Sequence, residues 1–203
     1  MNINEIRKAL ESGEWESVSI EIRPSIVKTP EGSLKPVFCH RHFRFPGSDR
    51  FELIFKNFAD PFGQIPLVTM EIKGHISFGA PHPISQGAFN ADYVADTSFR
   101  LTIQNENLVD ALNHALLEGS MEKWQINVGQ EVRGKNLPAF GLQGGEDFRE
   151  FDLIFLYDGM LFNGSRNIDG RPFDKPENRP TNLQIPLKRI YHFKHSATSN
   201  DPN

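Results

Sequence analysis

Residues 51–78 read FELIFKNFADPFGQIPLVTMEIKGHISF, and they are the most informative segment about the fold. In both halves every second residue is large and apolar: Phe51, Leu53, Phe55, Val68, Met70 and Ile72. A period of two places these side chains on one face of a strand and the polar residues between them on the other. The Asp-Pro-Phe-Gly sequence at residues 60–63 predicts a turn, and Gly74 predicts a bulge or a corner in the second strand. The stretch therefore predicts two antiparallel strands with one buried face.

The same signature extends along the chain. The 203 residues include 17 Phe but only 2 Trp and 3 Tyr, and 16 Gly and 14 Pro mark frequent turns. About eight to ten short strands are expected, for example at residues 38–45, 91–103 and 124–128, and Asp158-Gly159 is a strong hairpin turn. Nothing alternates as β-α-β. The predicted fold is all-β with two short helices, an antiparallel meander closed into a β-barrel, because closure removes exposed strand edges.

The length predicts one domain. Residues 1–14 are expected to form a helix that packs on the barrel, because Ile3, Ile6 and Leu10 recur at helical spacing. Residues 15–194 form the single barrel domain, and the polar residues 195–203 are expected to be a disordered tail. A second helix is expected over residues 108–117, with Asn105 or Asn107 as its N-cap, as a lid or a side pack on the barrel.

Composition excludes several classes of protein. The net charge is -4 and no basic stripe is present, so nucleic-acid binding lacks its electrostatic basis. No apolar run reaches the roughly 18–20 residues of a spanning helix. The single cysteine, Cys39, allows no intrachain disulfide and fits a reducing compartment. Because residues 1–15 also lack a signal-peptide pattern, we expect a cytoplasmic location.

No motif predicts catalysis, a metal or a cofactor. His40 and His42 share a strand face without a convincing third ligand, and Cys39 among them is more simply a small core residue, with Arg41 paired to a carboxylate. The glycine-rich residues 141–145 lack the lysine and the strand-to-helix context of a phosphate-binding loop. Asp147, Glu150 and Asp152 cluster near a strand, but alternation and solvation explain them as well as acid–base chemistry does.

The barrel interior is the predicted binding site. A barrel of about eight strands can hold one small ligand, and a lumen of Phe, Met and Ile side chains favours an apolar one. The predicted ligand-binding residues are Phe43, Phe45, Phe55, Met70, Ile72, Tyr93, Trp124, Ile126 and Phe155. The pattern alone does not separate residues that touch ligand from those that fill the barrel, since a register slip of one residue exchanges the faces.

Several strings together resemble the adenomatosis polyposis coli down-regulated domain family, known from a cell-surface antagonist of Wnt signalling. Trp15 precedes a Glu-Ile-Arg-Pro string at residues 21–24, where the family has Glu-Val-Arg-Pro. Arg41-His42-Phe43 and later Leu161-Phe162-Asn163-Gly164 follow in family order. The similarity covers residues 15–187, although Ile20 and Gly63 stand where the family has cysteines.

This resemblance implies a lipocalin-like barrel whose cavity takes a lipid acyl chain. The expected function is therefore a non-catalytic binding protein that holds a fatty acyl chain or a similar lipid; a lipidated protein is a further candidate partner. A polar mouth of Arg23, Arg41 and Lys73 would meet a carboxylate head, and Arg23 is expected to pair with Asp60.

Two alternatives stay open. One is an enzyme that uses the same cavity through His42, Tyr93 or a carboxylate. The other is a protein-interaction module with a filled barrel. An open apolar cavity favours the binding protein, a buried carboxylate–His pair the enzyme, and a filled interior the interaction module.

Overall fold

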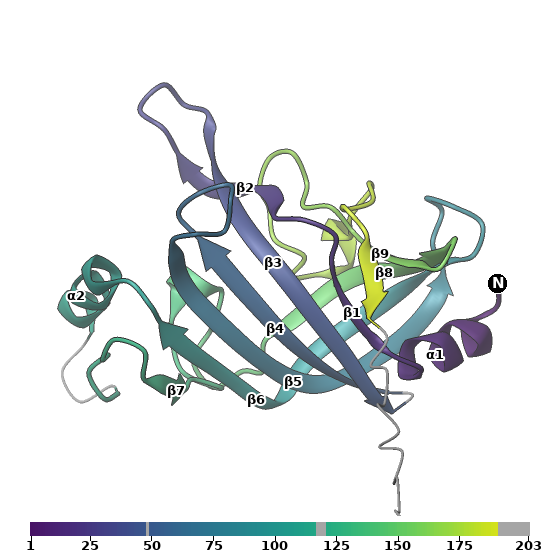
Figure 1. Ribbon diagram of the computed structural model, residues 1–203, viewed down its shortest axis with the longest axis horizontal. Helices are drawn as coiled ribbons and strands as arrows, with labels where there is room; N and C mark the ends of the chain where they lie inside the picture. The colour runs from purple at the N-terminus through teal and green to yellow at the C-terminus, as the bar shows by residue number, and fades with distance from the viewer. Residues whose placement is uncertain (48, 117–120, 191–203) are drawn as a thin grey trace, which may run out of the picture.

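The computed structural model describes residues 1–47, 49–116 and 121–190. Within these ranges the protein is mostly antiparallel β-sheet with two α-helices and two 3₁₀ helices (Figure 1). In chain order the elements are α1 (Ile3–Glu11), β1 (Glu14–Ser17), β2 (Glu21–Lys28), β3 (Leu34–Gly47), β4 (Arg50–Phe58), β5 (Pro66–Pro81), β6 (Ala88–Ile103), α2 (Glu106–Ala115), β7 (Gly129–Glu131), η1 (Pro138–Phe140), β8 (Arg149–Tyr157), β9 (Met160–Asn163), η2 (Pro176–Asn178) and β10 (Leu187–Ile190). The predicted tail lies outside the described residues.

The strands pair into a closed ring. Along the sheet the order is β1-β10-β9-β8-β6-β5-β4-β3-β2, and β1 also pairs with β3. Trp15 of β1 therefore lies opposite Arg189 of β10 and also opposite Phe43 of β3. The long strands β3–β6 form the curved wall seen across the centre of Figure 1, and the shorter strands complete the ring.

The predicted irregularity at Gly74 is confirmed. The pairing of β5 with β6 shifts register between Lys73 and His75. A Cβ atom on Gly74 would lie 1.8 Å from the carbonyl oxygen of Val94 in β6. Only glycine fits where these two backbones approach so closely, and the shift adds local twist that helps the long strands to curve.

The two helices lie at opposite ends of the curved sheet (Figure 1). In α1, Asn2 and Glu5 form a capping box, and Ile6 and Leu10 are buried in the core, as the spacing predicts. In α2 the side chain of Asn105 accepts a hydrogen bond from the Leu108 N–H, which confirms that cap. No residue of α2 is buried, so this helix is packed far more lightly than α1.

Two sequence expectations are wrong. Residues 124–128 form a loop, in which Asn127 has a left-handed φ of 59° and Val128 is 47% exposed. The regular alternation there is therefore not that of a strand. The two prolines and the glycine of residues 25–36 predict a loop, but β2 and β3 continue into this segment and enclose only a short turn. None of the described helices is long and apolar enough to cross a bilayer.

Candidate functional site: the inner face of the strand ring

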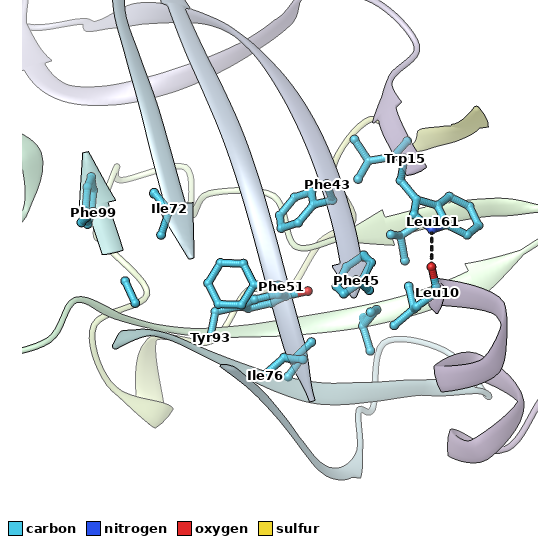
Figure 2. Close-up of a cluster of buried hydrophobic side chains, with 14 of the residues drawn as sticks. Leu10, Trp15, Phe43, Phe45, Phe51, Ile72, Ile76, Tyr93, Phe99 and Leu161 are labelled. Atoms are coloured by element: carbon cyan, nitrogen blue, oxygen red, sulfur yellow. Dashed lines mark hydrogen bonds between the residues drawn. The ribbon is translucent and has the colours of Figure 1, made fainter. Parts of the chain in front are cut away.

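Aromatic side chains fill the centre of the ring. Phe43, Phe51 and Tyr93 point inward from β3, β4 and β6 and meet there (Figure 2). The Phe51 and Tyr93 ring centroids lie 5.2 Å apart in an edge-on contact, and those of Phe43 and Tyr93 lie 6.0 Å apart. Phe45 stacks on Phe43 at 5.6 Å. All four are less than 10% exposed, so this part of the interior is packed like an ordinary core.

The inner face is less covered along β4 and the neighbouring part of β5, although Val68, Leu101 and Ile103 nearer α2 are buried. Leu53, Phe55 and Met70 continue the inward-facing rows of β4 and β5, but each is only half-buried. Other half-buried apolar side chains pack against the same core: Leu108, Val109, Leu112, Leu116, Met121, Phe140 and Phe148. Apolar surface therefore remains accessible on this side of the ring.

Trp124 links α2 to the core. Its backbone N–H donates to the side chain of Asn113 in α2 at 2.7 Å, and its carbonyl accepts from the same amide at 3.0 Å. The indole is 2% exposed, yet its Nε1–H has no hydrogen-bond partner among the residues that the structure describes. The other tryptophan, Trp15, donates its Nε1–H to the Leu10 carbonyl at 3.3 Å (Figure 2). The two tryptophan side chains therefore lie near opposite ends of the ring, Trp15 beside α1 and Trp124 beside α2.

A charged cluster also faces inward, with Glu21 of β2 at its centre. Glu21 is fully buried. One carboxylate oxygen, Oε1, accepts from Arg41 Nε at 2.7 Å and from Ser17 Oγ at 2.6 Å, and Oε2 accepts from Arg23 Nε and Nη2 at 3.0 and 2.7 Å. Burial alone would raise the pKa of Glu21, but the two guanidinium groups and the hydroxyl outweigh it and lower this pKa to about 2.

The two arginines of the cluster differ in how many partners they have. Arg41 is buried and also donates to Asn163 Oδ1 at 2.8 Å and to the Ile185 carbonyl at 3.4 Å. Arg23 lies over the ring of Phe55 at 5.7 Å and is partly open to solvent. Its Nη1 forms no hydrogen bond with any described residue. Arg41 therefore forms hydrogen bonds within the protein through Nε, Nη1 and Nη2. Arg23 uses only Nε and Nη2 in this way, and it lies beside the half-buried Phe55.

The network continues to β6, β8 and β9. Asn163 Nδ2 donates to the Tyr93 hydroxyl and to the Leu153 carbonyl, both at 3.2 Å. Asp152 is 7% exposed, and its Oδ1 accepts from the N–H groups of Leu153 and Gly164. Burial, and then the nearby Glu150 carboxylate, raise the pKa of Asp152 to about 7. Burial likewise raises the pKa of Tyr93.

The structure separates the predicted apolar site residues into three groups. Six of them lie on the inner face: Phe43, Phe45, Phe55, Met70, Ile72 and Tyr93. Trp124 is buried beside α2, while Ile126 lies in an exposed loop. Phe155 alternates with the buried Ile154 and Leu156 and lies on the outer face, where it packs against Tyr157 and Phe162.

The predicted polar mouth is only partly brought together. Arg23 and Arg41 meet through Glu21, but Lys73 lies on the outer face of β5 and pairs with Glu52 at 3.3 Å. The expected pairing of Arg23 with Asp60 is wrong. Burial opposes the charge on Asp60, but its carboxylate accepts hydrogen bonds from three N–H groups of its own turn, and together these outweigh burial and lower the pKa of the carboxyl.

His42 and Cys39, which were considered for catalysis or metal binding, do not form a site together. His42 lies on the outer face of β3, where its Nε2 is 2.7 Å from a carboxylate oxygen of Glu14. Cys39 points to the opposite face, and burial raises the pKa of its thiol to about 11, which opposes nucleophilic reactivity. Among the described residues no three His, Cys, Asp or Glu side chains are grouped as a metal site.

Glu150 and Asp152 form a cluster in the sequence that alternation and solvation explain as well as acid–base chemistry does. Their spacing of two places both on the inner face of β8, in register with Tyr93 and Ala91 of β6. Their even-numbered parity, shared with Ile154 and Leu156, is the signal that could have indicated an inward position.

No protein-family model matches the chain.

Proposed function

We propose that this protein is a non-catalytic binding protein that holds a fatty acyl chain or a similar lipid against the inner face of its strand ring, which we interpret as a lipocalin-like β-barrel. One observation carries the proposal. Leu53, Phe55 and Met70 point inward yet remain half-buried, and they continue an apolar wall without a break from the core. Inward-facing apolar surface that the protein leaves uncovered is what an apolar ligand would cover.

The ligand lies at the α2 end of the ring in this proposal. The packed rings of Phe43, Phe51 and Tyr93 leave no path through the centre, so they form the floor of the site. The lightly packed α2 and the segment around Trp124 form its cover. A chain gains about 0.8 kcal/mol per buried methylene, so affinity should rise with chain length until the floor is reached.

The resemblance to the adenomatosis polyposis coli down-regulated domain is part of the same proposal, with the chain as a single-domain, cysteine-poor relative. Its partner would be a lipid acyl chain, or a protein that carries one. The one cysteine, buried Cys39, is in keeping with a cytoplasmic location.

Displacement of an environment-sensitive dye by fatty acids of increasing length tests the proposal. Leu53→Trp fills the proposed site and should weaken binding and shorten the preferred chain. Ile54→Trp is the matched control, because Ile54 is the next residue of β4, is equally half-buried and faces outward. Circular dichroism verifies that both variants fold.

A folded wild-type protein from which no fatty acid of eight to eighteen carbons displaces the dye would overturn the lipid-binding proposal. The second candidate, a protein-interaction module, would then be preferred. The observation that favours it is the aromatic packing that already fills the ring centre around Phe43 and Tyr93.

A further inference from the structure

A row of apolar side chains crosses the outer face of the sheet at one end. Ile22 of β2, Phe38 of β3, Phe58 of β4 and Pro66 of β5 lie opposite one another in register. They face outward, because Phe58 follows the outward-facing Ile54 at an even spacing on β4. Ile22 is 60% exposed, Pro66 is exposed and the two phenylalanines are half-buried. The row is therefore open to the surroundings of the protein and is not part of its core.

Two loops extend this row beyond the strands. In the turn between β4 and β5, Phe62 is 77% exposed and Ile65 is 52% exposed. The side chain of Ile20, in the loop before β2, reaches the same turn: a Cβ atom on Gly63 would lie 2.7 Å from Ile20 Cδ1 and 3.7 Å from Phe58 Cζ. Row and loops thus form one continuous surface, of the kind that marks an interaction site. We call it the rim patch, and it comprises Ile20, Ile22, Phe38, Phe58, Phe62, Ile65 and Pro66.

The rim patch lies at the α2 end of the ring. Figure 1 shows the β4–β5 turn and α2 at the same end of the curved sheet. The chain just before α2 contacts the chain just after this turn, because the Gln104 N–H donates to the Leu67 carbonyl at 2.9 Å. No residue of α2 is buried. The rim patch is therefore next to the most lightly packed helix of the described structure.

The β4–β5 turn pairs its own backbone donors. The Asp60 carboxylate accepts from the N–H groups of Phe62, Gln64 and Ile65 at 2.8, 3.0 and 2.7 Å. The Gly63 N–H donates to the Asp60 carbonyl at 3.4 Å, and the remaining residue at the tip is a proline, which has no N–H. A segment that enters the apolar part of a membrane must satisfy such groups internally. The tip can therefore present Phe62 and Ile65 to lipid without leaving a donor unpaired.

Cations lie next to the rim patch. The adjacent outward-facing row on β3, β4 and β5 is His40, Lys56 and Thr69, which lie opposite one another and include no carboxylate. Lys56 and Lys35, at the start of β3, are exposed and form no ion pair with a described residue. The one carboxylate of the turn, Asp60, is directed at the N–H groups of its own backbone. Lysines beside exposed apolar side chains favour binding to an anionic lipid surface.

We propose that the rim patch docks on the surface of a membrane that contains anionic lipids, with Phe62 and Ile65 inserted and Lys35 and Lys56 at the headgroups. This docking goes beyond the proposed function and does not depend on it, since the patch lies outside the ring. A second copy of the chain is disfavoured as the occupant, because in a symmetric contact the unpaired Lys56 side chains of the two copies would meet.

A tryptophan at position 62 tests insertion directly. The native residues Trp15 and Trp124 are 1% and 2% exposed, so their emission should not respond to lipid. In full-length Phe62→Trp, vesicles of phosphatidylcholine and phosphatidylglycerol should shift the emission to shorter wavelength, and brominated lipid should quench it. Tyr157→Trp is the matched control, because Tyr157 is 64% exposed in the β8–β9 hairpin, outside the rim patch. Its emission should not change.

Sedimentation with the same vesicles measures what each part of the rim patch contributes. Phe62→Ser should lower the vesicle affinity about tenfold, because a large apolar side chain no longer enters the lipid. Lys56→Gln should lower the affinity for these vesicles about fivefold and leave binding to pure phosphatidylcholine unchanged. Lys8→Gln is the control, because Lys8 is exposed on α1 at the other end of the sheet, and it should bind like the wild type. Circular dichroism verifies that each variant folds.

The proposal is overturned if the wild-type protein does not sediment with the anionic vesicles, or if Phe62→Trp responds no more than its control. Equal affinity for vesicles with and without phosphatidylglycerol would overturn the assignment of an anionic surface. A wild-type dimer that ignores vesicles and that Phe62→Ser dissociates would show that a second copy covers the patch instead. None of these measurements uses a ligand inside the ring, so a failure of the proposed function is recognised separately, by dye displacement without vesicles.

Discussion

Asp152→Asn should make the protein more stable above neutral pH, contrary to the usual effect of changing a buried polar residue. The pKa of Asp152 rises from its ordinary value of 3.8 to about 7 in the folded state, because burial and Glu150 disfavour the carboxylate. Between these two values the folded protein binds a proton that the unfolded chain has released, so the free energy of unfolding falls as the pH rises. A pKa difference of about 3 corresponds to about 4 kcal/mol, which is lost fully above about pH 7.

Asparagine removes this pH-dependent loss. Its Oδ1 can still accept from the Leu153 and Gly164 N–H groups, so the hydrogen bonds to Asp152 Oδ1 are retained. We expect Asp152→Asn to match the wild type near pH 4 and to exceed it by up to about 4 kcal/mol at about pH 8. Urea unfolding at a series of pH values measures the difference, and subtraction cancels the titration of every other group. The exposed Asp110→Asn serves as the control.

A difference in the free energy of unfolding between variant and wild type that stays constant from about pH 4 to about pH 8 would contradict this prediction. It would mean that Asp152 titrates alike in the folded and unfolded states. A difference that grows in favour of the wild type as the pH rises would show that the buried carboxylate is stabilised by its surroundings, and the assignment of Glu150 as its unfavourable neighbour would be wrong.

Three further predictions concern the stability and reactivity of the fold. Glu21→Gln should lower the free energy of unfolding by about 3–5 kcal/mol, because it leaves two inward-facing arginines poorly paired. The surface variant Glu16→Gln should lower it by at most about 1 kcal/mol, and urea unfolding of both variants measures the difference. The Cys39 thiol should not react with a chromogenic disulfide reagent in the native protein at about pH 8 and should react fully in urea, since burial raises its pKa to about 11; rapid native labelling would contradict this. Gly74→Ala should destabilise the protein by more than about 2 kcal/mol or prevent folding, because the new Cβ would meet the β6 backbone. The control Gly47→Ala should be close to neutral, because its Cβ would meet nothing within 4 Å. Melting temperatures measure both effects, and equal values for the two variants would show that β5 and β6 can separate at no cost.

The sequence predicted best where a strand has one apolar and one polar face. In β4 and β5 the alternation around Phe51 and Ile72 identified the buried face correctly, and Gly74 marked the register shift. These strands separate the interior from water, so their pattern records the difference between the two sides. The α1 and α2 helices were also recognised, from periodic apolar residues and Asn caps.

Prediction failed where both faces of a strand are covered. The β8 strand is apolar in nearly every position after Glu150, and Leu153 on its outer face is as fully buried as Ile154 on its inner face. Parity then carries little information, which is why Phe155 was assigned to the wrong face. The prediction of a strand at Trp124 failed for another reason. Two hydrogen bonds with the side chain of Asn113 in α2 fix the backbone of Trp124, and the alternation of residues around Trp124 does not indicate this contact.

The charged cluster could be predicted in composition but not in arrangement. Glu21, Arg23 and Arg41 all appear in strings with family resemblance, and the pairing of Arg41 with a carboxylate was expected. That Glu21 would serve both arginines depends on the register of β2 against β3, which places Glu21 opposite Cys39. Such a register is set by pairing over the whole hairpin and not by any local string.

The pairing of β1 with β10 has a consequence for how the chain folds. Arg189 reaches back to the Ala9 carbonyl across 180 residues of sequence, and β1 also pairs with β10. Contacts this distant in sequence give a high contact order, so closing the ring should be a late and slow event. During synthesis the pairing of β1 with β10 must wait until almost all of the described chain has emerged. Until then the free edges of β1 and β9 remain exposed, and this is the period in which a nascent chain would most need protection from aggregation.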